Sequence, residues 1–197
     1  MNTIVTKFGG SSLADSEQFR KVKNILDADK NRKFVIPSAP GKRNPKDFKI
    51  TDLLYLCHGH VQSSIPLDDV FKLIGERYKN IVNDLNLNLD IDYHLNIIKT
   101  DIENGASKDY AASRGEYLNG LILANYLDAE FIDAKDVIKF NNCGSIDEKE
   151  TFKRLKERLS TEKRAVIPGF YGSDMNNEII TFSRGGSDVT GALVAAS

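Results

Sequence analysis

Short apolar runs and longer amphipathic stretches alternate along this chain of 197 residues. Residues 3–6 and 33–36 are short runs rich in β-branched and apolar side chains, and each predicts a strand, the first of them buried. Between them, Asp15 followed three residues later by Gln18 predicts the start of a helix. Its apolar stripe comprises Phe19, Val22, Ile25 and Leu26. A strand, a helix and a second strand of this length predict a βαβ unit with parallel strands.

Four helices are predicted in the middle of the chain. The first begins near residues 51–52, and residues 66–86 form the clearest helix because their apolar residues repeat at helical spacing. A weaker helix over 92–103 completes an αα-hairpin, which we interpret as a helical insert over about 66–105. Residues 107–127 predict another long helix. The apolar stripe of residues 66–86 comprises Leu67, Val70, Phe71, Ile74, Tyr78, Ile81, Val82 and Leu85.

The last third of the chain returns to short strands. Residues 129–134, 164–170 and 178–182 each predict a strand. Ser145 and Glu148 form a capping box that predicts a further helix, and a last helix over 189–196 would be capped by Ser187 or Asp188. The whole pattern predicts an α/β fold in which a mostly parallel sheet carries helices on both faces.

Two glycine pairs at the ends of predicted strands are the clearest candidates for chemistry. Residues 7–12 read Lys-Phe-Gly-Gly-Ser-Ser, and residues 183–188 read Ser-Arg-Gly-Gly-Ser-Asp. Glycine lets an anion approach the main chain closely, and Lys7 adds a positive charge. Alone, the first stretch is equally compatible with a plain turn beside a surface lysine. Two such turns at strand ends of one sheet favour a phosphate and carboxylate site, because ligands bind at the carboxyl ends of parallel strands.

Other polar residues extend this candidate site. The loop over residues 40–49 is rich in Pro, Gly, Lys and Arg and predicts a mobile flap. Gly115 lies inside a predicted helix at a cost of about 1 kcal/mol, which indicates close approach of backbone or ligand and makes its neighbour Glu116 a candidate contact. Arg184 has a planar fork suited to a carboxylate. Asp188 can orient a lysine or help to organise a magnesium–phosphate cluster.

Composition removes several classes of function. The net charge of -1 gives no basic excess for nucleic acid or an anionic membrane. Without a signal pattern or a long apolar run, we expect a cytoplasmic protein, in which Cys57 and Cys143 are buried or idle thiols. His58 and His60 have no further ligand at metal-binding spacing, so we expect a helix end there and no metal held by the protein.

Five stretches, in order along nearly the whole chain, resemble aspartokinase, which has the amino-acid kinase fold. They are residues 7–12, 38–39, 49–54, 113–116 and 183–188. The resemblance implies phosphorylation of the side-chain carboxylate of L-aspartate by MgATP. The product is 4-phospho-L-aspartate, and the reaction is the first step towards lysine, threonine and methionine. ATP and Mg²⁺ are the implied cofactors.

The resemblance also implies roles for single residues. Lys7 contacts the ATP phosphates and Asp188 positions it, and these are the two implied catalytic residues. The phosphate loop consists of Gly9, Gly10 and Ser11, together with Lys7. Arg184 faces the α-carboxylate of aspartate and Glu116 faces its ammonium group. The remaining substrate-binding residues are Ser38, Thr51, Gly185, Gly186 and Ser187.

The family extends further than residue 197, with a nucleotide-binding half and regulatory ACT domains. We therefore expect residues 1–197 to be the N-terminal, aspartate-binding half of the kinase domain, to bind MgATP poorly, and to be inactive or weakly active alone. A homo-oligomer is expected for the full-length protein. Two alternatives stay open: a sister kinase acting on glutamate, and a truncated, non-catalytic module that binds aspartate.

Overall fold

The computed structural model describes residues 3–159, 163–183 and 185–197. Within these ranges, a four-stranded parallel sheet has the order β1-β2-β4-β3. Its strands are β1 (Ile4–Phe8), β2 (Arg32–Pro37), β3 (Glu130–Phe131) and β4 (Ala165–Val166). The helix α1 (Ser16–Asp27) connects the first two strands, so the predicted βαβ unit is confirmed. Its N-cap is Asp15, which accepts a hydrogen bond from the Gln18 main chain as the sequence predicted.

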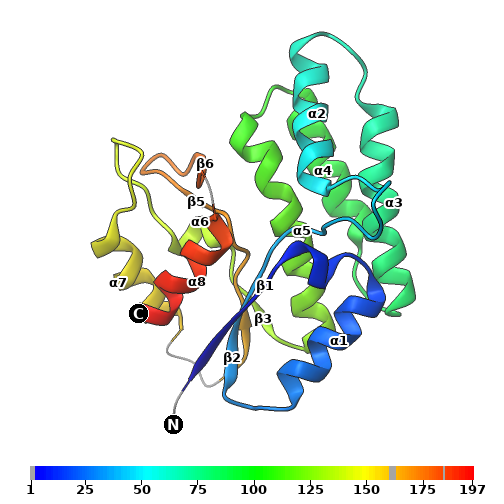
Figure 1. Cartoon of the computed structure of the whole chain (residues 1–197). Helices are drawn as coiled ribbons and strands as arrows, with labels where there is room; N and C mark the ends of the chain where they lie inside the picture. Colours follow the sequence, from blue (N-terminus) through cyan, green and yellow to red (C-terminus); the bar gives the residue numbers. More distant parts are fainter. Residues whose placement is uncertain (1–2, 160–162, 184) are drawn as a thin grey trace.

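Helices cover both faces of this sheet, as predicted (Figure 1). On one face lie α1, α2 (Ile50–Gln62), α3 (Asp68–Asp84), α4 (Ile91–Glu103) and α5 (Lys108–Leu127). On the other lie α6 (Ala134–Val137), α7 (Glu148–Arg158) and α8 (Gly186–Ala196). Successive strand residues serve opposite layers: Val35 joins the first core, whereas Phe34 and Ile36 join the second. This period of two is the reason that every one of these β2 side chains is apolar.

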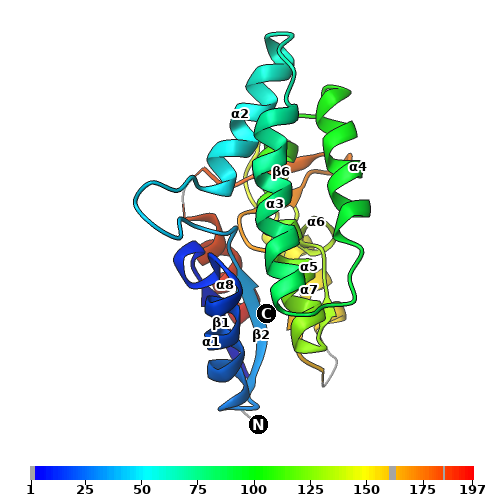
Figure 2. The ribbon, with the colours of Figure 1, turned by 90° about the vertical axis from the view of Figure 1, so that its right-hand side faces the viewer.

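The helices α3 and α4 pack against each other and against α2 and α5 (Figure 2). Phe71, Ile74 and Tyr78 of the predicted α3 stripe are buried there. His58 and His60 lie in the last turns of α2, so the predicted helix end is confirmed. The apolar face of α1 is narrower than predicted, because Ile25 is 47% exposed.

The prediction of a buried first strand is wrong. Among the described residues β1 pairs only with β2, so it is an edge strand of partly exposed residues. The predicted strand 129–134 is also shorter, because the side chain of Asp133 accepts a hydrogen bond from the Lys135 main chain and starts α6. A side-chain hydrogen bond to the main chain thus outweighed the β propensity of this segment.

The last predicted strand does not belong to the parallel sheet. Residues 178–182 contain β6 (Ile179–Thr181), which pairs in antiparallel fashion with β5 (Tyr171–Ser173) in a separate sheet. The turn between them is set by Asp174, whose side chain accepts hydrogen bonds from the main chain of Asn176 and Glu178. The two glycine pairs therefore do not end strands of one sheet, contrary to the prediction.

Two helix caps also differ from the prediction. The cap of α7 is Asp147, which accepts a hydrogen bond from the Glu150 main chain, and not Ser145. The cap of α8 is Gly185, whose φ of 59° is in the left-handed region that favours glycine, and not Ser187 or Asp188. Both serine and aspartate are good capping residues, so propensity alone could not decide between adjacent candidates.

The cap of α7 gives a direct test of this part of the fold. We expect Asp147→Ala to lower the free energy of unfolding by about 1 kcal/mol, because the Glu150 main-chain N–H loses its acceptor. The matched variant Ser145→Ala removes the residue that the sequence pattern favoured and should change stability by less than about 0.5 kcal/mol. Urea denaturation of both variants measures the difference. An equal loss in the two variants would contradict the observed cap.

Candidate functional site

A cavity of about 470 Å³ lies at the carboxyl ends of β1 and β2. Five residues predicted for the site line it: Gly10, Ser11, Ser38, Thr51 and Glu116. The loop after β2 supplies the rest of the lining, namely Ala39, Pro40, Gly41, Lys42 and Lys49. Stretches that are far apart in the sequence therefore converge on one space.

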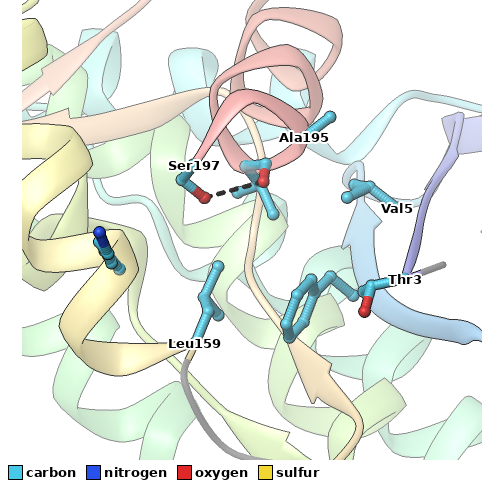
Figure 3. Close-up of a pocket in the computed structure, with 8 residues that line it drawn as sticks. Thr3, Val5, Leu159, Ala195 and Ser197 are labelled. Carbon is cyan, nitrogen blue, oxygen red and sulfur yellow. Dashed lines mark hydrogen bonds between the residues drawn. The ribbon is translucent and has the colours of Figure 1, made fainter. Parts of the chain in front are cut away.

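A second cavity, of about 400 Å³, lies at the opposite end of β1 (Figure 3). Thr3 and Val5 line it from the start of the sheet, Leu159 from the end of α7, and Ala195 and Ser197 from the end of α8. Parallel α/β sheets bind ligands at the carboxyl ends of their strands. The cavity beside Glu116 is therefore the candidate site.

The two loops that form this site touch through their main chains. The N–H of Gly41 donates to the carbonyl of Gly10 at 2.8 Å. A Cβ atom on Gly10 would lie 2.8 Å from the Ala39 carbonyl oxygen, closer than real Cβ contacts, and 3.0 Å from the Gly41 nitrogen, which is also tight. Gly10 is thus required for the packing of one loop against the other, a reason that the sequence did not reveal.

Gly115 allows α5 to approach the same loop. A Cβ atom on Gly115 would lie 2.8 Å from the Cβ of Ala39. The prediction that a glycine inside this helix indicates close backbone approach is therefore confirmed. The hydroxyl of Tyr78 on α3 donates to the Gly115 carbonyl at 2.8 Å and holds the helix in place. As a result, the next residue, Glu116, lies against the cavity.

Glu116 is a buried carboxyl group in the cavity wall. Only 6% of the residue is exposed, and Oε2 has no hydrogen-bond partner within the described ranges. Burial raises its pKa to about 8, and hydrogen bonds from main-chain groups, first that of Ala39, oppose the rise. Burying an ionised carboxylate with one oxygen unpartnered is unfavourable. The site is therefore suited to a ligand that brings a positive charge to Glu116.

The two glycine turns meet at the edge of this cavity although their strands belong to different sheets. Lys7 Nζ and Asp188 Oδ1 form an ion pair at 2.9 Å. The hydroxyl of Ser38 donates to that of Ser187 at 3.0 Å. Because the side chain of Asp188 is 71% exposed, this pair adds little stability, but it brings the lysine amino group of the first turn to the second turn.

The remaining predicted residues are placed as follows. Gly9 precedes the 3-10 turn η1 (Gly10–Leu13), and its nearest neighbour at the Cβ position is the Lys7 amino group at 3.9 Å. Gly186 lies in the first turn of α8, where a Cβ atom would be 2.8 Å from Phe170 Cα. Arg184 lies outside the described residues.

Asn119 is a site residue that the sequence did not single out. It is fully buried on α5, and its amide donates to the Ser38 carbonyl at 2.6 Å, while its Oδ1 has no partner in the described part of the chain. It follows Glu116 by three residues and so lies on the same face of the helix. In the sequence, the only sign of this role is that Asn119 follows Glu116 at helical spacing within a largely apolar helix.

Arg114, two residues before Glu116 in the sequence, is buried among tyrosine rings and does not line the cavity. Its buried guanidinium lies 4.5 Å from the ring centroid of Tyr110, 4.7 Å from that of Tyr117 and 5.3 Å from that of Tyr171. Cation–π contacts of this kind stabilise most when they are desolvated. They fix α5 against β5 and hence against the second glycine turn.

Other potential sites are limited within the described ranges. No group of three or more His, Cys, Asp or Glu side chains there could hold a metal ion. In the same ranges, no helix combines the length and apolar character needed to cross a membrane. Cys57 is buried, and burial raises the pKa of its thiol to about 12, so it is an inert core residue, whereas Cys143 is exposed.

Comparison with known proteins gives one consistent family. The model of the amino acid kinase family matches residues 2–197. Aspartokinase 3 of Bacillus subtilis is 35% identical over 97% of this chain and 45% of its own length. The crystal structure of Clostridium acetobutylicum aspartate kinase is 64% identical, with a TM-score of 0.97 over 100% of this chain and 45% of that one.

A more distant structure shows the same fold. Escherichia coli aspartokinase III, solved with aspartate and ADP, is 24% identical with a TM-score of 0.81, over 98% of this chain and 46% of that one. This chain therefore spans a little under half the length of these relatives.

The contact between the two loops can be tested with neighbouring glycines. We expect Gly10→Ala to lower the free energy of unfolding by about 1–3 kcal/mol, because its methyl group would collide with main-chain atoms of the second loop. Gly9→Ala has room and an extended φ of -74°, so it should leave stability unchanged or raise it by up to about 1 kcal/mol. Urea denaturation measures both. Similar effects in the two variants would contradict the close packing of these loops.

The raised pKa of Glu116 predicts a particular pH dependence of stability. Because its folded pKa of about 8 exceeds the ordinary value of 4.5, its stabilising contribution is complete below pH 4.5 and is lost as the pH rises to about 8. Each pH unit in that window costs about 1.4 kcal/mol. From about pH 6 to about pH 8, the wild type should lose about 2–3 kcal/mol more than Glu116→Gln. Parallel curves for the two proteins in chemical denaturation would show that Glu116 titrates normally.

Proposed function

The chain belongs to the amino acid kinase family, and on that basis we propose that it is the aspartate-binding half of an aspartate kinase domain. The reaction would transfer the γ-phosphoryl group of ATP to the side-chain carboxylate of L-aspartate. The relatives named above, one of them 64% identical, are aspartate kinases and support this choice within the family. The single structural observation that supports it most is the buried carboxyl group of Glu116, whose Oε2 has no partner among the described residues, in a cavity lined by hydroxyl groups.

The cavity supplies complementary groups for a zwitterionic substrate. Glu116 would accept hydrogen bonds from the α-ammonium group, which favours the ionised carboxylate and removes the cost of burying it alone. Hydroxyl groups of Ser38, Thr51 and Ser187 would bind substrate oxygens. Arg184, outside the described residues, is the proposed partner of the α-carboxylate, with Gly185 and Gly186 shaping its turn.

Lys7 is the proposed contact for the transferring phosphoryl group. Its ion pair with Asp188 holds the amino group beside the glycine turn formed by Gly9, Gly10 and Ser11, which would accommodate the phosphates. The exposed carboxylate of Asp188 has oxygen lone pairs remaining and fits a role at the edge of a magnesium–phosphate cluster. When bound with ATP, Mg²⁺ would neutralise charge on the phosphate oxygens.

The reaction requires little proton transfer from the protein. One oxygen of the aspartate side-chain carboxylate forms a bond to the γ-phosphorus, and the bond from that phosphorus to the β,γ-bridging oxygen breaks to release ADP. The carboxylate is already ionised at neutral pH, so no general base is needed. The residues described here would act by positioning the substrate and by balancing charge.

The chain covers only part of its relatives, which supports the proposal that aspartate and the nucleotide base bind to different halves of the kinase domain. Residues 1–197, with the helical pair α3–α4 as an insert over about 66–105, would supply the aspartate pocket and the phosphate turn. The groups that bind adenine and ribose would lie in the part of the relatives that this chain does not cover. A homo-oligomer is proposed for the full-length protein only.

We expect calorimetric titration to show L-aspartate binding to this chain, with L-glutamate binding more weakly. Succinate, which lacks the ammonium group, should bind at least about tenfold more weakly than aspartate to the wild type, a difference of about 1.4 kcal/mol. In Glu116→Gln the affinity for aspartate should fall towards that for succinate, because the charge partner of the ammonium group is gone. Lys7→Ala should retain aspartate binding.

Phosphoryl transfer is measured as ADP release from MgATP on addition of L-aspartate, for this chain and for a form extended to the length of its relatives. Lys7→Ala should abolish transfer in the extended form. Stronger binding of glutamate than aspartate would favour the sister kinase. Aspartate binding without ADP release in either form would favour a non-catalytic binding module.

A further inference from the structure

Arg77 on α3 is a buried arginine that the mechanism above does not use. Only 5% of the residue is exposed. Its guanidinium donates to Asp47 Oδ2 at 2.5 Å, to the Gly41 carbonyl at 3.0 Å and, more weakly, to the Ala14 carbonyl at 3.4 Å. One side chain thus joins three separate segments: the end of the first glycine turn, the start of the loop after β2, and the end of that loop.

Asp47 is the second member of this arrangement. Its carboxylate also accepts hydrogen bonds from Arg43, through the Nε at 2.9 Å, the terminal nitrogen at 3.0 Å and the main-chain N–H at 2.9 Å. The hydrogen bonds from Arg43 hold the pKa of Asp47 well below its usual range. Asp47 therefore stays charged at neutral pH and closes the loop back on itself.

The segments that Arg77 joins are the walls of the candidate site. Pro40, Gly41, Lys42 and Lys49 of this loop line the cavity. Arg77 lies on the other side of the loop, where a separate, smaller depression is lined by Arg43, Asp47 and Leu73. The loop has no helix or strand over residues 41–49, so its position depends on contacts such as these.

We propose that the Arg77–Asp47 ion pair is a positioning pair that holds the loop over residues 40–49 against the first glycine turn and thereby preorganises the substrate cavity. This inference rests on the proposed function only in naming L-aspartate as the ligand. The sequence pattern indicated a mobile flap, whereas the geometry shows both ends of the loop tied to one helix.

General stability is a weaker explanation for this pair. A buried ion pair pays a large desolvation cost, and apolar residues of similar volume often stabilise a fold as well or better. Burial lowers the pKa of Arg77, and its Nε has no partner among the described residues. The surroundings of Arg77 therefore disfavour a positive charge at this position. What the guanidinium provides is a fixed, multidentate geometry between separate segments.

The test compares Arg77→Met, Arg77→Lys and Lys79→Met, two residues later on the same helix. Lys79 forms an exposed ion pair with Asp92 of α4 at 2.5 Å, so Lys79→Met removes an α3 ion pair remote from the cavity. Hydrogen exchange of the free protein should show lost protection over residues 38–50 in Arg77→Met, with α5 and the sheet unchanged. Lys79→Met should match the wild type, and Arg77→Lys should be intermediate.

Ligand titration completes the test. If only molecules with an ordered loop can bind, the apparent Kd equals the intrinsic Kd divided by the fraction of molecules whose loop is ordered. We therefore expect the Kd for L-aspartate to be about tenfold weaker in Arg77→Met. The Kd for succinate should weaken by the same factor, because the partner of the ammonium group is intact. Saturating L-aspartate should restore loop protection to the wild-type level.

Each outcome decides the proposal. Unchanged loop protection and an affinity within about twofold of the wild type, or an equal loss of protection throughout the molecule, would overturn it. If the wild type binds no L-aspartate, the proposed function fails on its own. The exchange of the free loop then still decides whether the pair positions the cavity wall.

Discussion

The site depends on a close approach of main chains around Ala39. The first glycine turn and helix α5 approach this residue from different sides, and both contacts are possible only because Gly10 and Gly115 have no side chain. Since the Gly10–Gly41 contact is made between main-chain atoms, it has little freedom to adjust when a side chain is added. The cavity therefore inherits its shape from the packing of strand β2 and helix α5, which are elements of the core.

This rigid frame explains how a buried carboxyl group, which is unfavourable when ionised, can be held in the cavity wall. A buried carboxyl group such as Glu116 would normally be avoided or paired. Here the helix that holds it is fixed by Tyr78 on one side and by the aromatic rings around Arg114 on the other. The Glu116 carboxyl group cannot move out to solvent. The cost of burying its negative charge is therefore relieved either by protonation or by a cationic group of a ligand.

The sequence predicted the structure correctly where a physical rule allows only one local conformation. Helix existence, the parallel βαβ unit and the glycine within α5 followed from periodicity and backbone restrictions. It was insufficient where neighbours compete: Asp147 and Ser145 are both competent caps, and residues 178–182 have a pattern that suits either sheet. It also could not show that Gly10 faces Gly41, or that Asn119 reaches Ser38, because these pairings depend on tertiary packing. Residues from four of the five motifs line one cavity, whereas the contacts that Arg77 makes behind the loop could be read only from the structure.

The hydroxyl contact between Ser38 and Ser187 spans 149 positions of the chain. During synthesis, the first glycine turn, the loop after β2 and α5 all emerge well before α8 begins, so they must wait for the segment that carries Asp188. Contacts between distant positions form late because loop closure must be completed first. An emerging chain of this protein can thus bury much of its first core before Lys7 meets Asp188 and Ser38 meets Ser187. The order of residues along the chain in this way delays the assembly of the candidate site until α8 has followed the parallel sheet and α5.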